Sequence, residues 1–193
     1  MDAALMPDLL GYKDLAGVGL TRRQFERLIE AEEYERIAPG QFLRTGATDD
    51  TTAGWMAIAA KRPQATLCLL TALSIHDLTD EIPTRSNIAI PRGIKPVTIW
   101  TAPISWHHFN AATFDIGRTE HSLPGGRVIG LYSAERTIID LFRLSHDWGS
   151  DLAIDALKRW LRVKGNSPSK LLTMAKSFPK GRPALQNALE ILL

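Results

Sequence analysis

The sequence lacks several features that identify common protein classes. It contains a single cysteine, Cys68, so an internal disulfide is excluded, and the flanking leucines favour a small core residue over a nucleophile. The longest apolar stretch, ATLCLLTALSI at 65–75, is too short to cross a bilayer. The opening MDAALMPDLLG has none of the basic residues that begin a secretory signal. We therefore expect a cytoplasmic protein.

Motifs for catalysis and cofactor binding are also missing. There is no Gly-rich phosphate loop, no G-x-S-x-G and no H-E-x-x-H. Asp49-Asp50 and Asp80-Glu81 lie in turn-prone segments, where we interpret them as solvated caps. Arg136 and Asp140 are four residues apart, which predicts an ion pair within one helix. The histidines lack metal-ligand spacing: His76, His107, His108, His121 and His146. We therefore expect no catalytic residue, no metal and no cofactor.

Charge is nearly balanced but unevenly spread. The net charge is +2, whereas residues 1–46 carry six Lys and Arg against eight Asp and Glu, a net charge of −2. Eight basic residues and no acidic one lie between 158 and 182: Lys158, Arg159, Arg162, Lys164, Lys170, Lys176, Lys180 and Arg182. Such a stretch indicates either an anionic partner or a solvated helical face, and the composition leaves both open.

The segment TRRQFERLIE at 21–30 predicts a capped amphipathic helix. Thr21 suits the N-cap, and Gln24 completes a capping box. Phe25 and the apolar residues three and four positions later share one face, with arginines on the opposite face. Arg22 and Arg23 lie in the first turn, where cations oppose the helix dipole, so their placement indicates a role other than helix stability.

A hairpin is predicted directly after this helix. In YERIAPGQFLR at 34–44, Pro39-Gly40 suits a type II turn that would place Ile37 opposite Phe42. Upstream, GYKDLAGVG predicts a short helix at 12–16 ended by glycines. Short helix, turn, capped helix and hairpin follow one another in a winged helix-turn-helix, whose second helix enters the DNA major groove through its N-terminal residues. The negative charge of the segment leaves a protein-contact module as the alternative.

The remaining chain predicts a second, larger domain. After a polar linker at 45–52 we expect helices at 55–62 and 66–77, then strands at SNIAIP, VTIWTAP, TFDIG and GRVIGLY. Ser133 suits the N-cap of a helix through 145, followed by helices at 151–163, from Ser167-Pro168, and from about Arg182. The predicted class is α+β: a winged helix-turn-helix at 1–46, then a mixed α/β domain at 47–193 with a mostly β middle and a helical C-terminus.

Three stretches resemble the AbiEi-type antitoxins of type IV toxin–antitoxin systems and follow that family's order. They are GVGLTRRQFERLIEAEEYERIAPGQFLR, LLTALSIHDLTDEIP followed by NIAIPRG, and YSAERTIIDLFRLSHDWGSDLAIDALKRWLR. The resemblance implies a winged helix that represses its own promoter and a second domain that opposes a nucleotidyltransferase-like toxin, without enzymatic activity. The first helix of the winged unit would be short, only DAALM at 2–6. The implied DNA contacts are Arg22, Arg23, Gln24 and Arg27, with Arg36, Gln41 and Arg44 on the wing.

Three functions remain open at this point. The leading hypothesis is an antitoxin and autorepressor that binds operator DNA and counteracts its toxin. The second is an antitoxin that acts only by protein contact, without DNA binding. The third is a nucleic-acid-processing enzyme that uses Asp140, Asp151 and Asp155. For either antitoxin we expect contact with the toxin, or another anionic partner, at Lys158, Arg159, Arg162 and Lys164.

Overall fold

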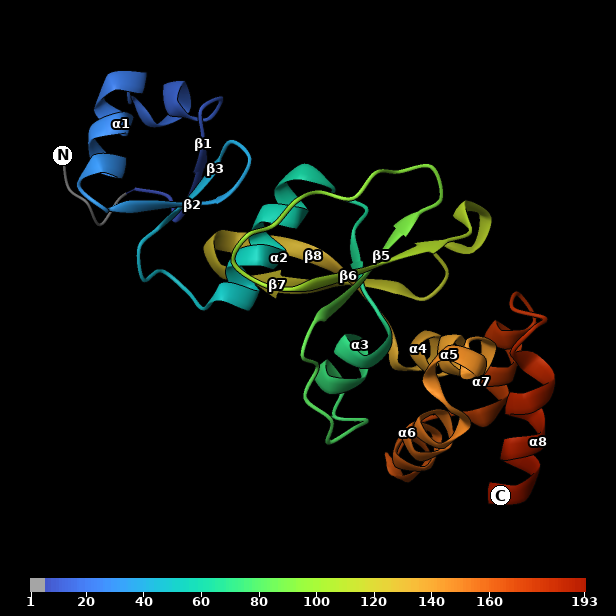
Figure 1. Ribbon diagram of the computed structural model, residues 1–193. Helices are drawn as coiled ribbons and strands as arrows, with labels where there is room; N and C mark the ends of the chain where they lie inside the picture. Colours follow the sequence, from blue (N-terminus) through green and yellow to red (C-terminus); the bar gives the residue numbers. More distant parts are fainter. Residues whose placement is uncertain (1–5) are drawn as a thin grey trace. The chain divides into compact units, whose positions relative to one another are not determined.

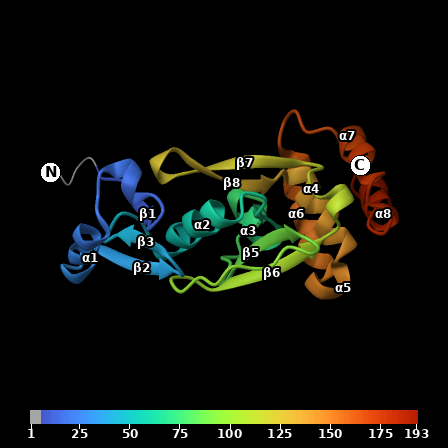
Figure 2. The same cartoon turned by 90° about the horizontal axis from the view of Figure 1, so that it is seen from above.

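A computed structural model describes residues 6–193 and has an α+β fold, as predicted. Residues 2–5 of the expected first helix lie outside the described residues. The chain forms two compact units. The first contains residues 1–65, 95–104 and 121–129, and the second contains residues 66–94, 105–120 and 130–193. Each unit can be followed in Figures 1 and 2.

The first unit begins with a small helix–sheet module. Strand β1 (Leu9–Gly11) leads through a 3₁₀ helix, η2 (Leu15–Val18), to helix α1 (Arg22–Glu30). Strands β2 (Tyr34–Ala38) and β3 (Gln41–Arg44) follow, and the sheet order is β1-β3-β2 with antiparallel neighbours. The predicted short helix is therefore present but begins at Leu15, three residues later than expected. The predicted hairpin also forms.

An aromatic cluster holds this module together. Phe25, on the inner face of α1, is fully buried, with its ring 5.2 Å from Phe42 of β3 and 5.4 Å from Tyr34 of β2 in edge-to-face arrangements. Aromatic pairs at this spacing contribute roughly 0.5–1.5 kcal/mol beyond the burial of their area. The predicted apolar face of α1 thus supplies the contact that fixes the helix on the sheet.

The register of the hairpin differs from the prediction. Pro39 and Gly40 form the turn, and Gly40 has φ of 68°, the conformation for which glycine was expected. Phe42, however, lies opposite Arg36 rather than Ile37, and Gln41 lies opposite Ala38. Ile37 is an extra residue on β2, a β-bulge, which the predicted one-to-one pairing did not allow for.

The first unit extends beyond residue 46, where the sequence placed a boundary. Helix α2 (Asp50–Lys61) is capped by Asp49, whose carboxylate accepts a hydrogen bond of 3.0 Å from the Thr52 amide. Gly54 of α2 lies so close to Ile99 that a Cβ atom there would be 3.3 Å from the isoleucine side chain. Helix α2 and the 95–104 segment therefore pack within this unit.

A five-stranded sheet runs in the order β6-β5-β4-β8-β7. Its central strand β4 (Thr66–Leu67) is antiparallel to β5 (Ser86–Pro91) and parallel to β8 (Arg127–Tyr132). The outer strands are β6 (Ile104–Phe109) and β7 (Arg118–Leu123). Two short 3₁₀ helices, η3 (Ala111–Thr113) and η4 (Pro124–Gly126), lie in the connections around β7.

Two of the predicted strands in this region were wrong, and one predicted helix begins later than expected, whereas SNIAIP and GRVIGLY form β5 and β8. Residues 97–103 and 113–117 are irregular or turn, whereas β6 and β7 were not predicted. Residues 66–67 pair as β4 before helix α3 (Leu69–Ile75) begins, and Leu69 makes the transition at a φ of 48°. Strand β4 exists through pairing with β5 and β8, which are distant from it in sequence, and this pairing overrides local propensity. Strands β6 and β7 pair instead with β5 and β8, their neighbours along the chain.

Helices form the other part of the second unit. Helix α4 (Ala134–Arg143) begins at Ser133, whose hydroxyl accepts from the Arg136 amide at 3.3 Å, as its predicted N-cap role requires. It is followed by α5 (Ser145–Trp148), α6 (Ser150–Arg162), α7 (Pro168–Ala175) and α8 (Arg182–Leu192). The predicted start of α7 at Ser167-Pro168 is confirmed by a 3.4 Å bond from the Lys170 amide to Ser167.

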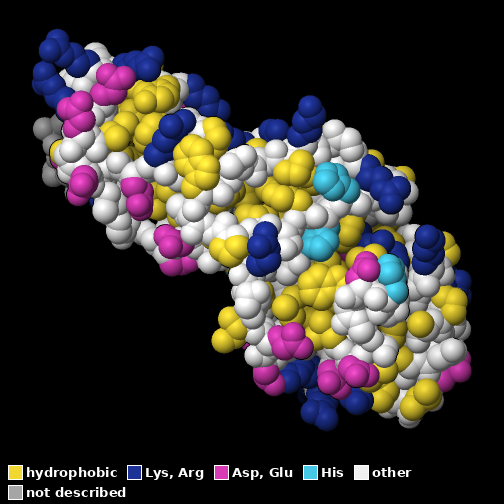
Figure 3. All heavy atoms as spheres, viewed as in Figure 1, with side chains coloured by type: hydrophobic (Ala, Val, Ile, Leu, Met, Phe, Trp, Pro, Cys, Tyr) yellow, Lys and Arg dark blue, Asp and Glu magenta, His cyan; other side chains and the backbone are white. Residues whose placement is uncertain are grey.

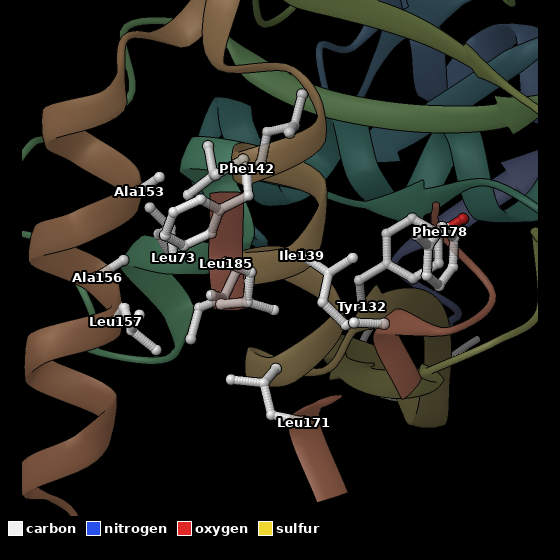
Figure 4. Close-up of a cluster of buried hydrophobic side chains, with 14 of the residues drawn as sticks. Leu73, Tyr132, Ile139, Phe142, Ala153, Ala156, Leu157, Leu171, Phe178 and Leu185 are labelled. Atoms are coloured by element: carbon white, nitrogen blue, oxygen red, sulfur yellow. The ribbon is translucent and has the colours of Figure 1, made fainter. Parts of the chain in front are cut away.

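Helix α4 is central to the hydrophobic core. All residues from 136 to 142 are buried, because α3, α6, α7 and α8 pack against different sides of the helix. Figure 4 shows Phe142 near Ala153, Ala156 and Leu157 of α6. Removing such a buried apolar side chain from water is worth roughly 1.5–3 kcal/mol. The whole middle of α4 is therefore buried, and not one face alone.

Among residues 6–193, no helix has the length and hydrophobicity needed to span a membrane.

Candidate nucleic-acid interface

The N-terminus of α1 is fixed by the predicted capping box. The Gln24 amide donates to Thr21 Oγ1 at 3.3 Å, while Gln24 Oε1 accepts from the Thr21 amide at 2.9 Å and from its hydroxyl at 2.8 Å. The side chain of Gln24, one of the predicted DNA contacts, is therefore engaged in the cap. The cap holds the first turn of α1 in a defined position.

Three arginines predicted to contact DNA lie on α1. Arg23 and Arg27 are on the face opposite Phe25, whereas Arg22 is on the side of the helix near Tyr12. Arg22 donates to Glu26 at 2.9 Å, which raises the pKa of the arginine, and its guanidinium lies 4.8 Å from the ring of Tyr12. Arg23 and Arg27 are exposed, and neither pairs with any partner within residues 6–193. Arg23 and Arg27 are thus the uncompensated charges of this helix. Figure 3 shows Lys and Arg side chains around α1, interspersed with acidic ones.

The predicted wing residues are in three different situations. Arg36 is exposed and stacks on Trp100, 5.0 Å from the centre of an indole that is 52% exposed. Arg44 binds Asp8 through Nε at 3.0 Å and Nη2 at 2.5 Å, and this hydrogen bonding raises the pKa of the arginine. Gln41 is only 7% exposed, and its Oε1 has no hydrogen-bond partner among residues 6–193. A side chain buried to this extent is not presented to a ligand at the surface.

The tip of the hairpin is tied to the rest of the unit. Lys61, at the end of α2, donates to the carbonyl of Pro39 in the turn, and burial lowers the pKa of this lysine. On β2, the carbonyl of Ile37 accepts from the Trp100 amide at 3.1 Å. Both bonds reduce the freedom of the hairpin, so its exposed groups are held in place.

The predicted toxin-contact residues lie on α6 and just beyond it. Lys158 pairs with Asp155 at 3.3 Å, and Arg159 forms a two-bond pair with Asp80, in which Nη1 and Oδ1 are 2.9 Å apart. Arg162 and Lys164 are exposed, and no carboxylate within the described chain pairs with them. Figure 3 shows Lys and Arg side chains over α6 beside acidic ones. Half of the predicted surface is therefore charge-compensated within the unit.

Groups of the kind used in catalysis are engaged in the structure. The described residues contain no group of three or more His, Cys, Asp or Glu arranged to hold a metal ion. Burial raises the pKa of the Cys68 thiol and lowers the pKa of His107, and the His107 ring bonds Asn87 at 2.9 Å. His76, the C-cap residue of α3, has its Nε2 2.8 Å from the carbonyl of Tyr132.

Two of the three carboxylates that the enzyme hypothesis requires, Asp140 and Asp155, form ion pairs within the protein. Asp140 is buried and is bonded by Arg136 and Arg143, as the predicted intrahelical pair requires for Arg136. Asp155 pairs with Lys158, while Asp151 is exposed in the first turn of α6. A carboxylate held between two guanidiniums is a structural element of the core, and it favours neither general-acid nor metal chemistry.

Several partnerships were not predicted from the sequence. These are Asp8 with Arg44, Asp80 with Arg159, Arg36 with Trp100, and Arg143 as the second partner of Asp140. The first three join residues at least 36 positions apart, so no local pattern could have indicated them. Arg143 is three residues after Asp140, so within α4 the local spacing did carry a signal for both of its arginine partners.

Comparisons with known proteins give a likeness in fold. No family model matches the sequence, and no curated protein matches it. The structure is similar to the crystal structure of the RV2827C protein from Mycobacterium tuberculosis, with a TM-score of 0.52 and 15% sequence identity. The alignment covers 96% of this chain and 76% of that chain. At this identity the likeness concerns the fold alone.

Proposed function

We propose that this chain is a DNA-binding antitoxin of the type IV class, which represses its own operon and counteracts a nucleotidyltransferase-like toxin. The observation that carries the DNA-binding part is the exposed, uncompensated pair Arg23 and Arg27 on a capped helix. That helix belongs to a β1–η2–α1–β2–β3 unit, the element order of a winged helix-turn-helix. The antitoxin part rests on the resemblance of three stretches of the sequence to the AbiEi-type family.

The chemistry of α1 supports recognition of DNA. Arg23 is in the first turn and Arg27 one turn later, so both project from the face opposite the aromatic cluster. Arginine is the side chain that most often reads guanine in the major groove, by donating to O6 and N7. The free amides of a helix N-terminus favour a phosphate at the same end. Arg36, beside the exposed Trp100, can add a backbone contact from the wing.

The proposal includes a cytoplasmic location and no enzymatic activity. Its test uses two readouts in one strain: repression of a reporter driven by the chain's own upstream DNA, and survival on expression of the adjacent toxin gene. Arg23→Ala/Arg27→Ala is expected to relieve repression and preserve survival. Loss of survival with intact repression would contradict this assignment of roles.

An antitoxin that acts only by protein contact is the second candidate. The net charge of −2 over residues 1–46 favours it, as do the pairing of Arg44 with Asp8 and the burial of Gln41. Non-specific DNA affinity grows with the number of phosphates neutralised, and these features reduce that number. This candidate predicts toxin protection without any shift of the upstream DNA in a gel.

A further inference from the structure

A cavity of about 270 Å³ in the second unit is lined by cationic side chains and by no carboxylate. Arg92 follows β5, Arg136 and Arg143 belong to α4, and Lys180 lies between α7 and α8. Four positive groups from three separate segments therefore converge on one small space. Charges of one sign repel each other, so their convergence costs stability in the empty state unless an anion compensates them.

Arg136 forms hydrogen bonds through Nε and Nη1, whereas Nη2 forms none within the described residues. Its side chain is only 1% exposed; Nε donates to Asp140 at 3.0 Å, and Nη1 donates to the carbonyls of Thr113 at 2.8 Å and Ile116 at 2.5 Å. Its other terminal nitrogen, Nη2, makes no hydrogen bond within residues 6–193, and it is not among the fully buried atoms that lack a partner. A nearly buried guanidinium that lines a cavity thus retains two donors for a ligand.

Arg143 repeats this arrangement two turns further along α4. Its Nε and Nη2 both donate to Asp140 Oδ1, at 3.1 and 2.9 Å, which leaves Nη1 without a bond in the described chain. Asp140 therefore orients both guanidiniums while neutralising only one of the two charges. Stacking adds further restraint, since Arg136 lies 4.3 Å from the Phe178 ring centre and Arg143 4.8 Å from that of Phe109.

The rim of the cavity adds groups without internal partners. Arg92 and Lys180 are exposed, and neither pairs with a carboxylate of the described residues. Asn110 uses Oδ1 to accept from the Ala112 amide at 3.0 Å, so its Nδ2 donors remain uncommitted. The donors thus outnumber the acceptors, which excludes a metal cation as the occupant.

We propose that this cavity binds the phosphoryl group of a small phosphorylated molecule, either as free phosphate or as the terminal group of a mononucleotide. Fixed guanidinium forks match the oxygens of a phosphate, and a dianion offsets the surplus charge. The volume is near the lower end for ligand pockets, which favours a small molecule over a polynucleotide. Phe109 and Phe178 are buried beneath arginines, so no aromatic face is open for stacking a base.

The test uses isothermal titration of the full chain with inorganic phosphate and with AMP, at constant ionic strength maintained with sodium chloride. We expect saturable binding of at least one probe. In Arg92→Gln/Lys180→Gln the affinity should fall about tenfold for each charge removed, the cost of a charge-assisted hydrogen bond. The matched control, Lys176→Gln/Arg182→Gln, removes two exposed charges that do not line the cavity and should bind as the parent chain does.

The two probes distinguish the sources. Equal affinities identify the phosphate itself as the ligand, and tighter AMP binding identifies a phosphorylated metabolite. Binding can also be located without any variant, because phosphate should shift the amide resonances of Asn110 and Ser177 before all others. Absence of saturable binding, equal losses in both double variants, or shifts confined to other segments would overturn the proposal. None of these outcomes bears on operator binding, since the cavity lies entirely in the second unit.

Discussion

At the scale of the single residue, Asp140 is a charged side chain buried in the core. Its side chain is 1% exposed and accepts bonds from Arg136 and Arg143. Breaking a buried pair by removing one partner leaves an uncompensated charge, which costs about 3–5 kcal/mol. We expect Asp140→Asn to lower the free energy of unfolding by about that amount, measured by urea denaturation.

A matched variant separates burial from charge. Asp155→Asn removes a carboxylate from an exposed pair with Lys158 and should cost no more than about 1 kcal/mol. Equal losses in the two variants would show that burial does not set the energy of the Asp140 cluster. The spacing of residues 136 and 140 predicted their pair, but not its burial. Local patterns predicted helices elsewhere in the chain, but no local pattern specifies that they pack around α4.

At the scale of the element, α1 depends on its cap because it has only nine residues. Helices this short are marginal without tertiary contacts and capping. Thr21→Ala removes one half of the capping box, so we expect a loss of about 0.5–2 kcal/mol in the free energy of unfolding. Operator affinity should fall as well, because the first turn carries Arg23.

The control for this prediction is Thr98→Ala, at an exposed threonine whose side chain makes no hydrogen bond in the described chain. Its stability and operator affinity should match those of the parent chain. If Thr21→Ala unfolds at the same urea concentration as the control, the capping box contributes nothing to α1.

Elements with local determinants could be predicted from the sequence, and those with distant determinants could not. Thr21, Ser133 and Ser167 each cap the helix they were expected to begin, because a cap needs only residues within one turn. Strand β4, in contrast, depends on partners far along the chain, β5 and β8. The candidate site divides in the same way. Periodicity predicted the exposure of Arg23 and Arg27, whereas the pairing of Arg44 with Asp8 spans 36 residues.

At the scale of the whole molecule, charge distribution governs the expected partners. The basic stretch at 158–182 is partly compensated by Asp155 and Asp80, which leaves Arg162 and Lys164 uncompensated on α6 and just beyond it. Exposed charges of this kind affect association rate more than affinity. We expect Lys158→Glu/Arg162→Glu to slow association with the toxin and to weaken its salt dependence, measured by stopped-flow kinetics.

Lys170→Glu/Lys176→Glu makes the same change in net charge within the basic stretch but outside α6. This control should associate with the toxin faster than the α6 variant, and both should bind operator DNA normally. Equal slowing in the two variants would assign the effect to overall charge. No slowing in either would identify the stretch as a solvated helical face.

Recognition of DNA by α1 is the central claim, and affinity for the chain's own upstream DNA tests it most directly. The measurement is a titration followed by fluorescence anisotropy at several salt concentrations, with unrelated DNA of equal length in parallel. Arg23→Ala and Arg27→Ala should each weaken specific binding by about 1–3 kcal/mol. A Lys13→Ala/Lys95→Ala control removes two exposed charges of the same unit outside α1 and should bind nearly as the parent does. An Arg23→Ala/Arg27→Ala variant with undiminished affinity, or a parent chain that binds unrelated DNA equally well, would contradict the account.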